Sequence, residues 1–264
     1  MVSSLCVRYT EGMSQLKFIG FVSVVIGLLT SCSHLSNSPQ EKEKTKLYLQ
    51  LSSDMFAQRN FPKALEYCYQ SLEIDPEFAP AYNHLGIIYM ETKRFSKSEE
   101  AFKTALKLSP NYPEVYNNLG VLMNRQDRYQ EAITYFDKAL KNDGYITPEN
   151  ALTNMGYSYY RLGNIAKAKS YHQKALNIVP EFCLANKNMG DTYAKEKKFQ
   201  RAVDSYSKAL ATCPLYEESH YKLGLALMKM GQKNVAKNQF EKLISRHKSG
   251  PYVDRSQEVL KYLQ

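Results

Sequence analysis

Apolar residues recur at helical spacing, in pairs of short segments, from residue 45 to residue 248. In the stretch 82–110 a first stripe comprises Tyr82, Leu85, Gly86 and Tyr89, and a second comprises Phe102, Ala105 and Leu106. A polar break at Lys93–Arg94 separates the two stripes, and Pro110 follows the second. Neither short helix could bury its stripe alone, so the pattern predicts a helical hairpin whose stripes face each other.

The hairpin pattern occurs six times, with a small residue at a fixed place in each first helix. These residues are Ser52, Gly86, Gly120, Gly156, Gly190 and Gly224, at steps of 34, 34, 36, 34 and 34 residues. A second small residue follows at Ala64, Ser98, Ala132, Ala168, Ala202 and Ala236, and then a bulkier one at Cys68, Phe102, Phe136, His172, Tyr206 and Phe240. Small residues let the two backbones approach. Pro76, Pro110, Pro180 and Pro214 end second helices because proline lacks a backbone donor.

This combination of small residue, bulky residue and terminal proline resembles the tetratricopeptide repeat. The resemblance implies an all-α, right-handed solenoid of six helix-turn-helix repeats over residues 45–248, in which each repeat packs on its neighbours. The third unit has two extra residues around Asn142–Pro148, which predicts a longer loop there. Residues 249–264 place apolar side chains on one side of a short helix and predict a C-terminal capping helix; partner binding is the alternative.

The first 31 residues are typical of a lipoprotein signal peptide. Lys17 precedes an apolar run, residues 18–30, that is too short to span a bilayer of about 30 Å. The sequence Leu29-Thr30-Ser31-Cys32 resembles the bacterial lipobox, which implies that Cys32 is diacylated and begins the mature chain. The alternatives are an ordinary secretory signal with a coincidental cysteine, or a buried helix. Met13 is a more natural start than Met1, because residues 1–12 carry almost no positive charge.

The polar segment 32–44 is expected to be a flexible tether that holds the repeats away from the lipid. Two or three acyl chains anchor a protein durably, whereas one chain gives only marginal binding. The resemblance to lipoproteins also implies sorting by the residue after the cysteine. That residue is Ser33 and not an aspartate, which favours the periplasmic face of the outer membrane.

Charge and chemistry favour a binding protein over an enzyme. The net charge is +9, but the basic residues are spread as KxxK and ExxK patterns without a dense basic run. We therefore expect solvated helix faces with a weak attraction to anionic surfaces, and no nucleic-acid partner. The five histidines, His34, His84, His172, His220 and His247, lack metal-binding spacing. There is no glycine-rich phosphate loop and no GxSxG motif. We therefore expect no catalytic residue, no metal and no cofactor.

Two of the five cysteines can meet. Cys183 opens the first helix of the fifth unit and Cys213 closes its second, so a hairpin brings them to the same end. In an oxidising compartment they could form a disulfide, which would stabilise the unit by roughly 3–4 kcal/mol. The alternative, two unpaired thiols pointing apart, is slightly favoured. Cys68 occupies a core position and Cys6 lies in the signal peptide.

The resemblance to tetratricopeptide repeats implies a concave face lined by the first helices. The candidate groove residues are Asn83, Ile87, Asn117, Asn118, Val121, Asn154, Tyr157, Tyr160, Asn188 and Tyr221, and the same mapping adds Leu49, Phe56, Met90, Asn124, Thr153, Lys187, Asp191, Leu225 and Met228. An amide both donates and accepts, so a row of asparagines could bind the backbone of an extended peptide. The alternative is that each residue faces water or packs on its neighbour.

The whole plan, a lipid-anchored protein with six repeats, resembles the type IV pilus biogenesis and stability lipoproteins, the pilotins of the secretin pore. The local match is best at 116–120 with 128–132, and in the junction 142–148. The resemblance implies a secretin subunit as partner and help with its outer-membrane targeting and multimerisation. The alternatives are a periplasmic adaptor that scaffolds cell-wall or other envelope complexes, and an enzyme-associated or chaperone module with a plain secretory signal.

Overall fold

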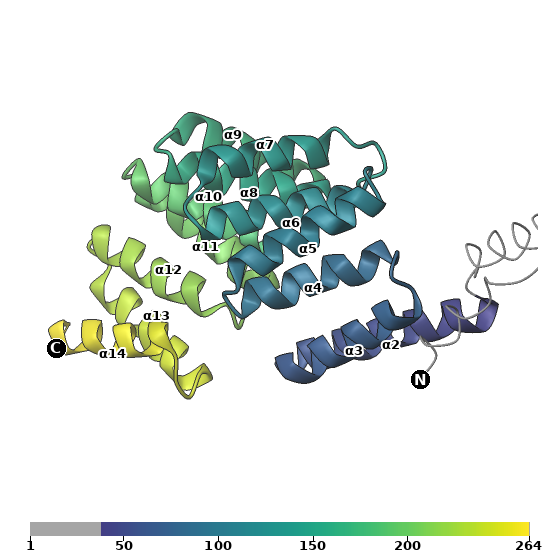
Figure 1. Cartoon of the computed structure of the whole chain (residues 1–264). Coiled ribbons are helices and arrows are strands. Elements are labelled where there is room, and N and C mark those ends of the chain that lie inside the picture. Colours follow the sequence, from purple (N-terminus) through teal and green to yellow (C-terminus); the bar gives the residue numbers. More distant parts are fainter. Residues whose placement is uncertain (1–37, 264) are drawn as a thin grey trace, which may run out of the picture.

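The computed structural model describes residues 38–263, and all secondary structure in this range is helical. The helices are α2 (Pro39–Ala57), α3 (Phe61–Ile74), α4 (Ala79–Glu91), α5 (Phe95–Leu108), α6 (Pro113–Arg125), α7 (Tyr129–Leu140), α8 (Pro148–Arg161), α9 (Ile165–Ile178), α10 (Cys183–Lys195), α11 (Phe199–Thr212), α12 (Glu217–Lys229), α13 (Lys233–Arg246) and α14 (Pro251–Tyr262). They pack as six consecutive hairpins, α2–α3 to α12–α13, followed by α14. The hairpins stack in an arch with α2–α3 at one end and α12–α14 at the other (Figure 1). The predicted fold class is confirmed.

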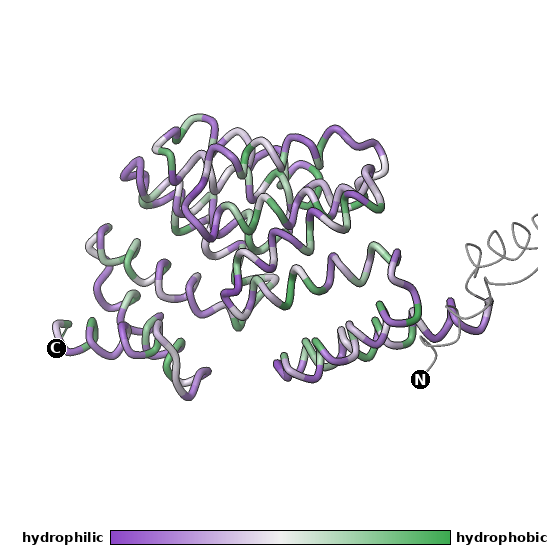
Figure 2. The backbone as a smooth tube through the Cα atoms, viewed as in Figure 1, coloured by the Kyte–Doolittle hydropathy of each residue, from purple (hydrophilic) through white to green (hydrophobic). Residues whose placement is uncertain are grey.

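Each hairpin closes around the small residue that the repeat pattern identified. A Cβ atom on Gly86 would overlap the ring of Phe102, and one on Gly120 would overlap the ring of Phe136. The first repeat has Ser52 in this position instead, where the hydroxyl donates to the Ala64 carbonyl at 2.6 Å. Hydrophobic and hydrophilic residues are interspersed along each helix, as the tube coloured by hydropathy shows (Figure 2).

The turn inside each hairpin requires a left-handed backbone residue. Arg59, Lys93, Asp127 and Lys197 all have φ of 59° at this position, whereas Gly163 and Gly231 occupy it in the fourth and sixth repeats with φ of 79° and 78°. A residue with a Cβ is strained in this region, and glycine is not. The reversal is the same in all six hairpins, so it comes from the fold and not from one residue type.

The first helix begins at Pro39 and not near residue 45. Ser38 and Glu41 form a capping box, in which the Ser38 hydroxyl accepts from the Glu41 N–H at 3.2 Å and the Glu41 carboxylate accepts from the Ser38 N–H at 2.7 Å. The expectation of a flexible tether is therefore wrong for residues 39–44, where a polar segment is helical because its start is capped. The signal peptide, Cys32 and residues 33–37 lie outside the described residues.

The two irregular parts of the repeat pattern appear as expected. A seven-residue junction separates α7 from α8; within it Tyr145 is buried and Ile146 is 83% exposed. At the other end Val253 of α14 is buried, and Val259, Leu260 and Leu263 pack on the core of the last repeats. Helix α14 thus covers the terminal apolar face, as a capping helix must. Among residues 38–263, no helix is long and apolar enough to cross a membrane.

Candidate protein-binding groove

The first helices of the repeats share one face of the solenoid. Helices α2, α4, α6, α8 and α10 follow one another side by side, and α12 is followed by α14. We call the surface formed by α2, α4, α6, α8, α10 and α12 the groove face. The residues that the sequence placed on it all lie on these helices.

The apolar and tyrosine candidates on the groove face are half-buried, except Met90, which is buried in the core and was wrongly placed on the open surface. Ile87 and Val121 pack on the central core with one side and leave part of their surface open. The ring of Tyr221 lies 5.9 Å from that of Phe240 and 5.7 Å from that of Tyr252 in α14. Partly accessible apolar or tyrosine side chains thus occur on α2, α4, α6, α8 and α12.

The asparagine amides bind one another across the repeats. Asn118 donates from Nδ2 to Oδ1 of Asn83 at 2.9 Å, and Asn154 donates to Oδ1 of Asn117 at 3.3 Å. Asn124 accepts from the Ser158 hydroxyl at 2.8 Å. Some of the amides that were predicted to bind a peptide therefore form hydrogen bonds between α4 and α6 and between α6 and α8 instead. The remaining hydrogen-bonding capacity is available on the groove face.

Asn188 does not fit the predicted row of peptide-binding amides. Its exposed fraction is 4%, and its Oδ1 has no hydrogen-bond partner among the described residues. Thr153 is likewise fully buried. The two residues lie on the neighbouring helices α10 and α8, and their burial removes both side chains from the surface that a peptide could contact.

An arginine held between two tyrosines marks the rim between the third and fourth repeats. The Arg161 guanidinium lies 4.8 Å from the ring centroid of Tyr129 and 5.7 Å from that of Tyr157. It also donates to the Tyr157 hydroxyl at 2.7 Å and pairs with Asp127 at 3.3 Å. A planar cation held over aromatic faces is preorganised for contact with a polar ligand group. The sequence mapping named Tyr157 but missed Arg161.

Four charged side chains form a compact cluster between α10 and α12. We call Lys187, Asp191, Glu218 and Lys222 the charged cluster. Lys222 lies 2.8 Å from both Asp191 carboxylate oxygens and 2.9 Å from Glu218, while Lys187 lies 3.5 Å from Asp191 and 3.4 Å from Glu218. Lys187 is buried, with an exposed fraction of 6%. Two cations face two anions, so the cluster is neutral as a whole.

The charges around Glu218 and Lys222 favour the ionised form of each of these two side chains. Burial alone would raise the pKa of the Glu218 carboxyl, but Lys187 and Lys222 outweigh it and lower that pKa. Burial alone would lower the pKa of Lys222, but Asp191 and Glu218 outweigh it and raise that pKa. Burial and then the Asp191 charge raise the pKa of Tyr206, so its hydroxyl stays a donor. This arrangement is a fixed polar link between the last two repeats.

The sequence contained a signal for the charged cluster that the repeat mapping passed over. Lys187 and Asp191 are four residues apart in α10, and Glu218 and Lys222 are four residues apart in α12 with the charges reversed. Opposite charges at this spacing pair within a helix. Their reversal in consecutive first helices allows the two pairs to join across the repeats.

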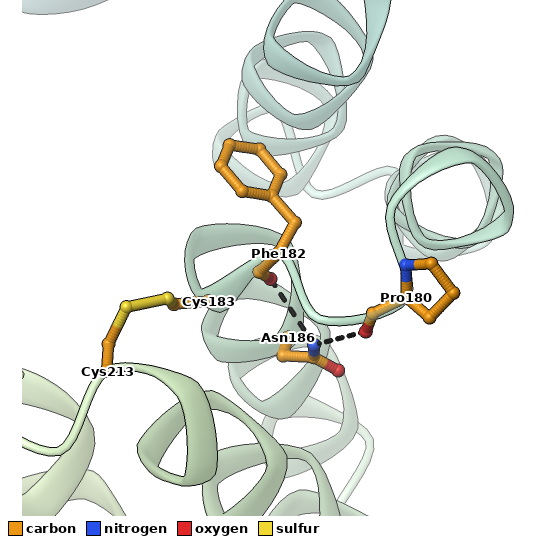
Figure 3. The surroundings of a disulfide bond; sticks show 5 residues. All are labelled: Pro180, Phe182, Cys183, Asn186 and Cys213. Carbon is orange, nitrogen blue, oxygen red and sulfur yellow. Dashed lines mark hydrogen bonds between the residues drawn. A yellow bond between two sulfur atoms is a disulfide. The ribbon is translucent and has the colours of Figure 1, made fainter.

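The structure joins Cys183 and Cys213 in a disulfide, in place of the unpaired thiols that were slightly favoured. Their Cα atoms are 6.1 Å apart, within the range of such bonds, because Cys183 opens α10 and Cys213 ends α11 (Figure 3). Close by, the Asn186 amide donates to the Pro180 carbonyl at 2.9 Å and fixes the turn before α10. An open apolar hollow of about 560 Å³ lies beside the bond, lined by Phe182, Cys183, Leu184, Cys213, Pro214, Leu215 and Tyr216.

Two observations concern possible metal ligands among the described residues. Within residues 38–263, no group of three His, Cys, Asp or Glu side chains could hold a metal ion. His172 is fully buried against Gly156, and burial lowers its pKa to about 3, with a smaller contribution from the Lys187 charge. It fills the bulky position of its repeat, as expected of a packed histidine.

Comparisons with known proteins agree with the repeat pattern. Family models of the tetratricopeptide repeat match residues 77–143, 149–182 and 218–249, and a TPR repeat model matches residues 190–231. A stretch of 79 residues is 30% identical to the uncharacterized protein ycf37 of Pyropia yezoensis. That match covers 27% of this chain and 44% of the relative, so the chain spans less than half of the relative's length.

Two solved structures resemble almost the whole described chain. The structure of PilW, a widely conserved type IV pilus biogenesis factor, has a TM-score of 0.72 and 25% sequence identity, and the likeness covers 82% of this chain and 98% of PilW. The structure of Pseudomonas aeruginosa PilF has a TM-score of 0.69 and 21% identity over 83% of this chain and 99% of PilF. Each likeness covers nearly the whole of the other protein. The chain therefore belongs to the tetratricopeptide repeat family, as a protein-interaction scaffold similar in structure to PilW and PilF.

Proposed function

We propose that this protein is a lipid-anchored, non-enzymatic scaffold of the bacterial envelope that assists outer-membrane targeting and multimerisation of a type IV pilus secretin. The observation that carries the proposal is the likeness to PilW, which covers 82% of this chain and 98% of that protein. Many unrelated proteins share single repeats, but a likeness over nearly the whole of one protein is a more specific resemblance. The partner is a protein, and no cofactor takes part.

The groove face supplies the surface for the secretin subunit. The half-buried residues Ile87 on α4 and Val121 on α6 can contact apolar side chains of an extended or helical segment of the secretin subunit. The amides of Asn117 and Asn154 and the tyrosine–arginine rim at Arg161 can orient its polar groups. A binding surface of this kind excludes water around a few apolar anchors and takes its selectivity from the polar rim.

The lipid anchor brings the scaffold and its client to the membrane. Cys32 carries the acyl chains, and Ser33 after it directs the protein to the periplasmic face of the outer membrane. Because α2 begins at Pro39, six residues separate Cys32 from the helix, and even fully extended they reach only about 20 Å. The first repeat therefore stays close to the lipid surface, where a client could pass directly into the membrane.

The experiment measures heat-resistant secretin multimer in outer-membrane fractions of a deletion strain that encodes a pilus secretin. We expect the multimer to disappear, to return with the wild-type chain, and not to return with Cys32→Ser. Ser33→Asp is the matched control, because it keeps the lipidated cysteine and changes only the sorting residue. Unchanged multimer in the deletion strain would overturn the proposal and point to another envelope client, such as a cell-wall complex.

A second pair of variants separates the groove from the anchor. Val121→Gln changes the groove face, and Ile178→Gln changes an apolar residue at the end of α9 that is 50% exposed. Both replace one aliphatic side chain by an amide and leave the lipid signal intact. We expect only Val121→Gln to reduce co-purification of the secretin. Equal binding by both variants would exclude the groove face as the docking surface.

A further inference from the structure

The fold gathers basic residues along one edge of the solenoid. The six turns within the hairpins, with the helix ends that flank them, are residues 57–63, 91–97, 125–131, 161–167, 195–201 and 229–235, and we call them the turn edge. They contain fifteen Lys and Arg residues and four Asp and Glu residues. The five connections between hairpins, residues 71–80, 105–114, 139–150, 175–184 and 209–218, contain two Lys and nine Asp and Glu. The repeat thus brings cations that are distant in the sequence to the same edge of the solenoid, where most of their side chains are solvated.

Among the described residues, turn-edge cations without a carboxylate partner lie mainly in the two end pairs of repeats, with four in the first two repeats (Arg59, Lys93, Arg94 and Lys97) and five in the last two. In the third and fourth repeats Arg125 pairs with Glu91 and Arg161 pairs with Asp127. In the fifth and sixth, the one acidic residue of the turn edge is Glu196, which pairs with Lys198 and Lys169. Five other cations here have no carboxylate within 4.0 Å among residues 38–263: Lys195, Lys197, Arg201, Lys229 and Lys233.

Local backbone physics does not favour basic residues at two of these places. Lys197 has φ of 59°, in the left-handed region where the sixth repeat uses Gly231. Arg201 lies in the first turn of α11, where the helix dipole attracts anions and repels cations. Arg201 gains a contact with the Tyr193 ring at 5.7 Å, but Lys197 is exposed. The cation at Lys197 therefore has no structural role among the described contacts.

We propose that the turn edge of the fifth and sixth repeats binds an acidic, extended polypeptide segment of a partner protein. The contact residues are Lys195, Lys197, Lys198, Arg201, Lys229 and Lys233. Carboxylates of such a segment would meet both the side-chain cations and the free N–H groups at the starts of α11 and α13. Lys195 and Lys229 end α10 and α12 at the border of the groove face, and the other four contact residues lie outside the helices that form it. The inference does not depend on the secretin as client.

The observations favour an acidic polypeptide over other polyanions. A second copy of this chain would have to dock through its acidic connections against the repulsion of two chains that each carry a net charge of +9. The large apolar residues between these cations, Phe199 and Met230, are half-buried and cannot insert into lipid. Nucleic-acid bases need exposed aromatic rings to stack on, and Tyr193 is covered by Arg201.

The test uses the full-length protein in detergent and a fluorescein-labelled twelve-residue peptide of alternating Glu and Gly. Fluorescence anisotropy should show binding that weakens steeply with salt, and no binding of the matching Gln–Gly peptide. The triple variant Lys197→Gln, Lys198→Gln, Lys229→Gln should lose at least tenfold in affinity. The control triple Lys107→Gln, Lys208→Gln, Lys242→Gln removes the same charge from exposed positions elsewhere and should lose less than twofold.

Three results would overturn the proposal. Equal loss in both triple variants would mean that only net charge matters. Equal binding of the Gln–Gly peptide would mean that carboxylates are not recognised. Stronger binding, lost in the turn-edge variant, to phosphatidylglycerol vesicles or to single-stranded DNA than to the acidic peptide would assign the edge to a membrane or a nucleic acid. Circular dichroism of both triples must match the wild type, because an unfolded variant would lose binding for another reason.

Discussion

The hydroxyl of Tyr206 donates a 2.7 Å hydrogen bond to the carboxylate of Asp191. Tyr206 fills the bulky position of α11, and Asp191 points from α10 towards α12, so the bond connects the core of the fifth repeat to the charged cluster. Tyr206 is nearly fully buried, and the Asp191 carboxylate also receives both lysines of the cluster. Asp191 is thus the one acceptor shared by three donors.

Removing the Asp191 charge should destabilise the protein strongly. In Asp191→Asn, Lys187 and Lys222 keep only Glu218 as a counter-ion, and breaking a buried pair from one side costs about 3–5 kcal/mol. We expect a loss of about 2–4 kcal/mol in urea unfolding, because Lys222 is partly exposed. Tyr206→Phe is the control; it removes one hydrogen bond and should cost only about 1 kcal/mol. Equal effects of the two variants would contradict a shared-acceptor role.

The small positions should tolerate no added methyl group. In Gly120→Ala the new Cβ overlaps the Phe136 ring, which is fully buried and has no free space to move into. Overpacking of this kind costs about 1–3 kcal/mol, and we expect the upper end. Gly144→Ala is the matched control, since its Cβ meets only the Asn142 side chain at 3.2 Å in an exposed loop. Thermal unfolding of both variants tests the difference.

The hairpins were predictable from the sequence because each one depends on short-range spacing. The pairs Gly86–Phe102 and Gly120–Phe136 lie sixteen residues apart in the chain and in contact in the structure, and their repetition makes the pattern visible. The small residue of the first helix and the bulky residue of the second then determine the hairpin, because only a close helix crossing buries both side chains. The start of α2 was missed because a polar, lysine-rich segment becomes helical through the Ser38–Glu41 capping box and not through an apolar stripe.

The candidate site was less predictable because its contacts join different repeats. The amide pair Asn118–Asn83 spans 35 residues, and only the arrangement of α4 beside α6 shows that the amides bind each other. Burial of Asn188 depends on how closely α8 and α10 approach. The basic turn edge also depends on contacts between repeats. No single cation in the sequence indicates it, and the edge becomes basic only because the repeats stack in register.

Glycine should stabilise the turns that now contain lysine. Lys93 and Lys197 have φ of 59°, and a left-handed conformation costs an L-residue about 1–2 kcal/mol. We therefore expect Lys93→Gly to raise the free energy of unfolding by about 1 kcal/mol, less the small entropic advantage that glycine gives the unfolded chain. Lys97→Gly, in the first turn of α5, should do the opposite. A destabilised Lys93→Gly would show that the lysine makes a contact that outweighs the strain.

The Cys183–Cys213 bond should be measurable by thiol titration and by stability. Denatured protein should show two more thiols after reduction than before it, and the same count in both samples would exclude the bond. The bond closes a loop of 30 residues, so reduction should lower the free energy of unfolding by about 3–4 kcal/mol in the loop-entropy account. Cys68→Ala controls for reagent effects, because this buried thiol takes no part in the bond.

Acid should destabilise the protein through His172. Burial lowers the pKa of His172 to about 3 in the folded state, against about 6.5 in the unfolded chain, so the unfolded state binds more protons between these values. Stability is then complete above pH 6.5 and falls as the pH drops below it, by about 2 kcal/mol between pH 7 and pH 5. His172→Phe should remove this part of the pH dependence, because Phe102, Phe136 and Phe240 fill the same position against glycine in other repeats. The pKa values of His84 and His220 are lowered mainly by burial as well, so a weaker dependence of stability on pH should remain in His172→Phe.

Urea unfolding of wild type and His172→Phe at both pH values measures the difference in pH dependence. Parallel pH profiles of the two proteins would show that His172 is not the group that titrates.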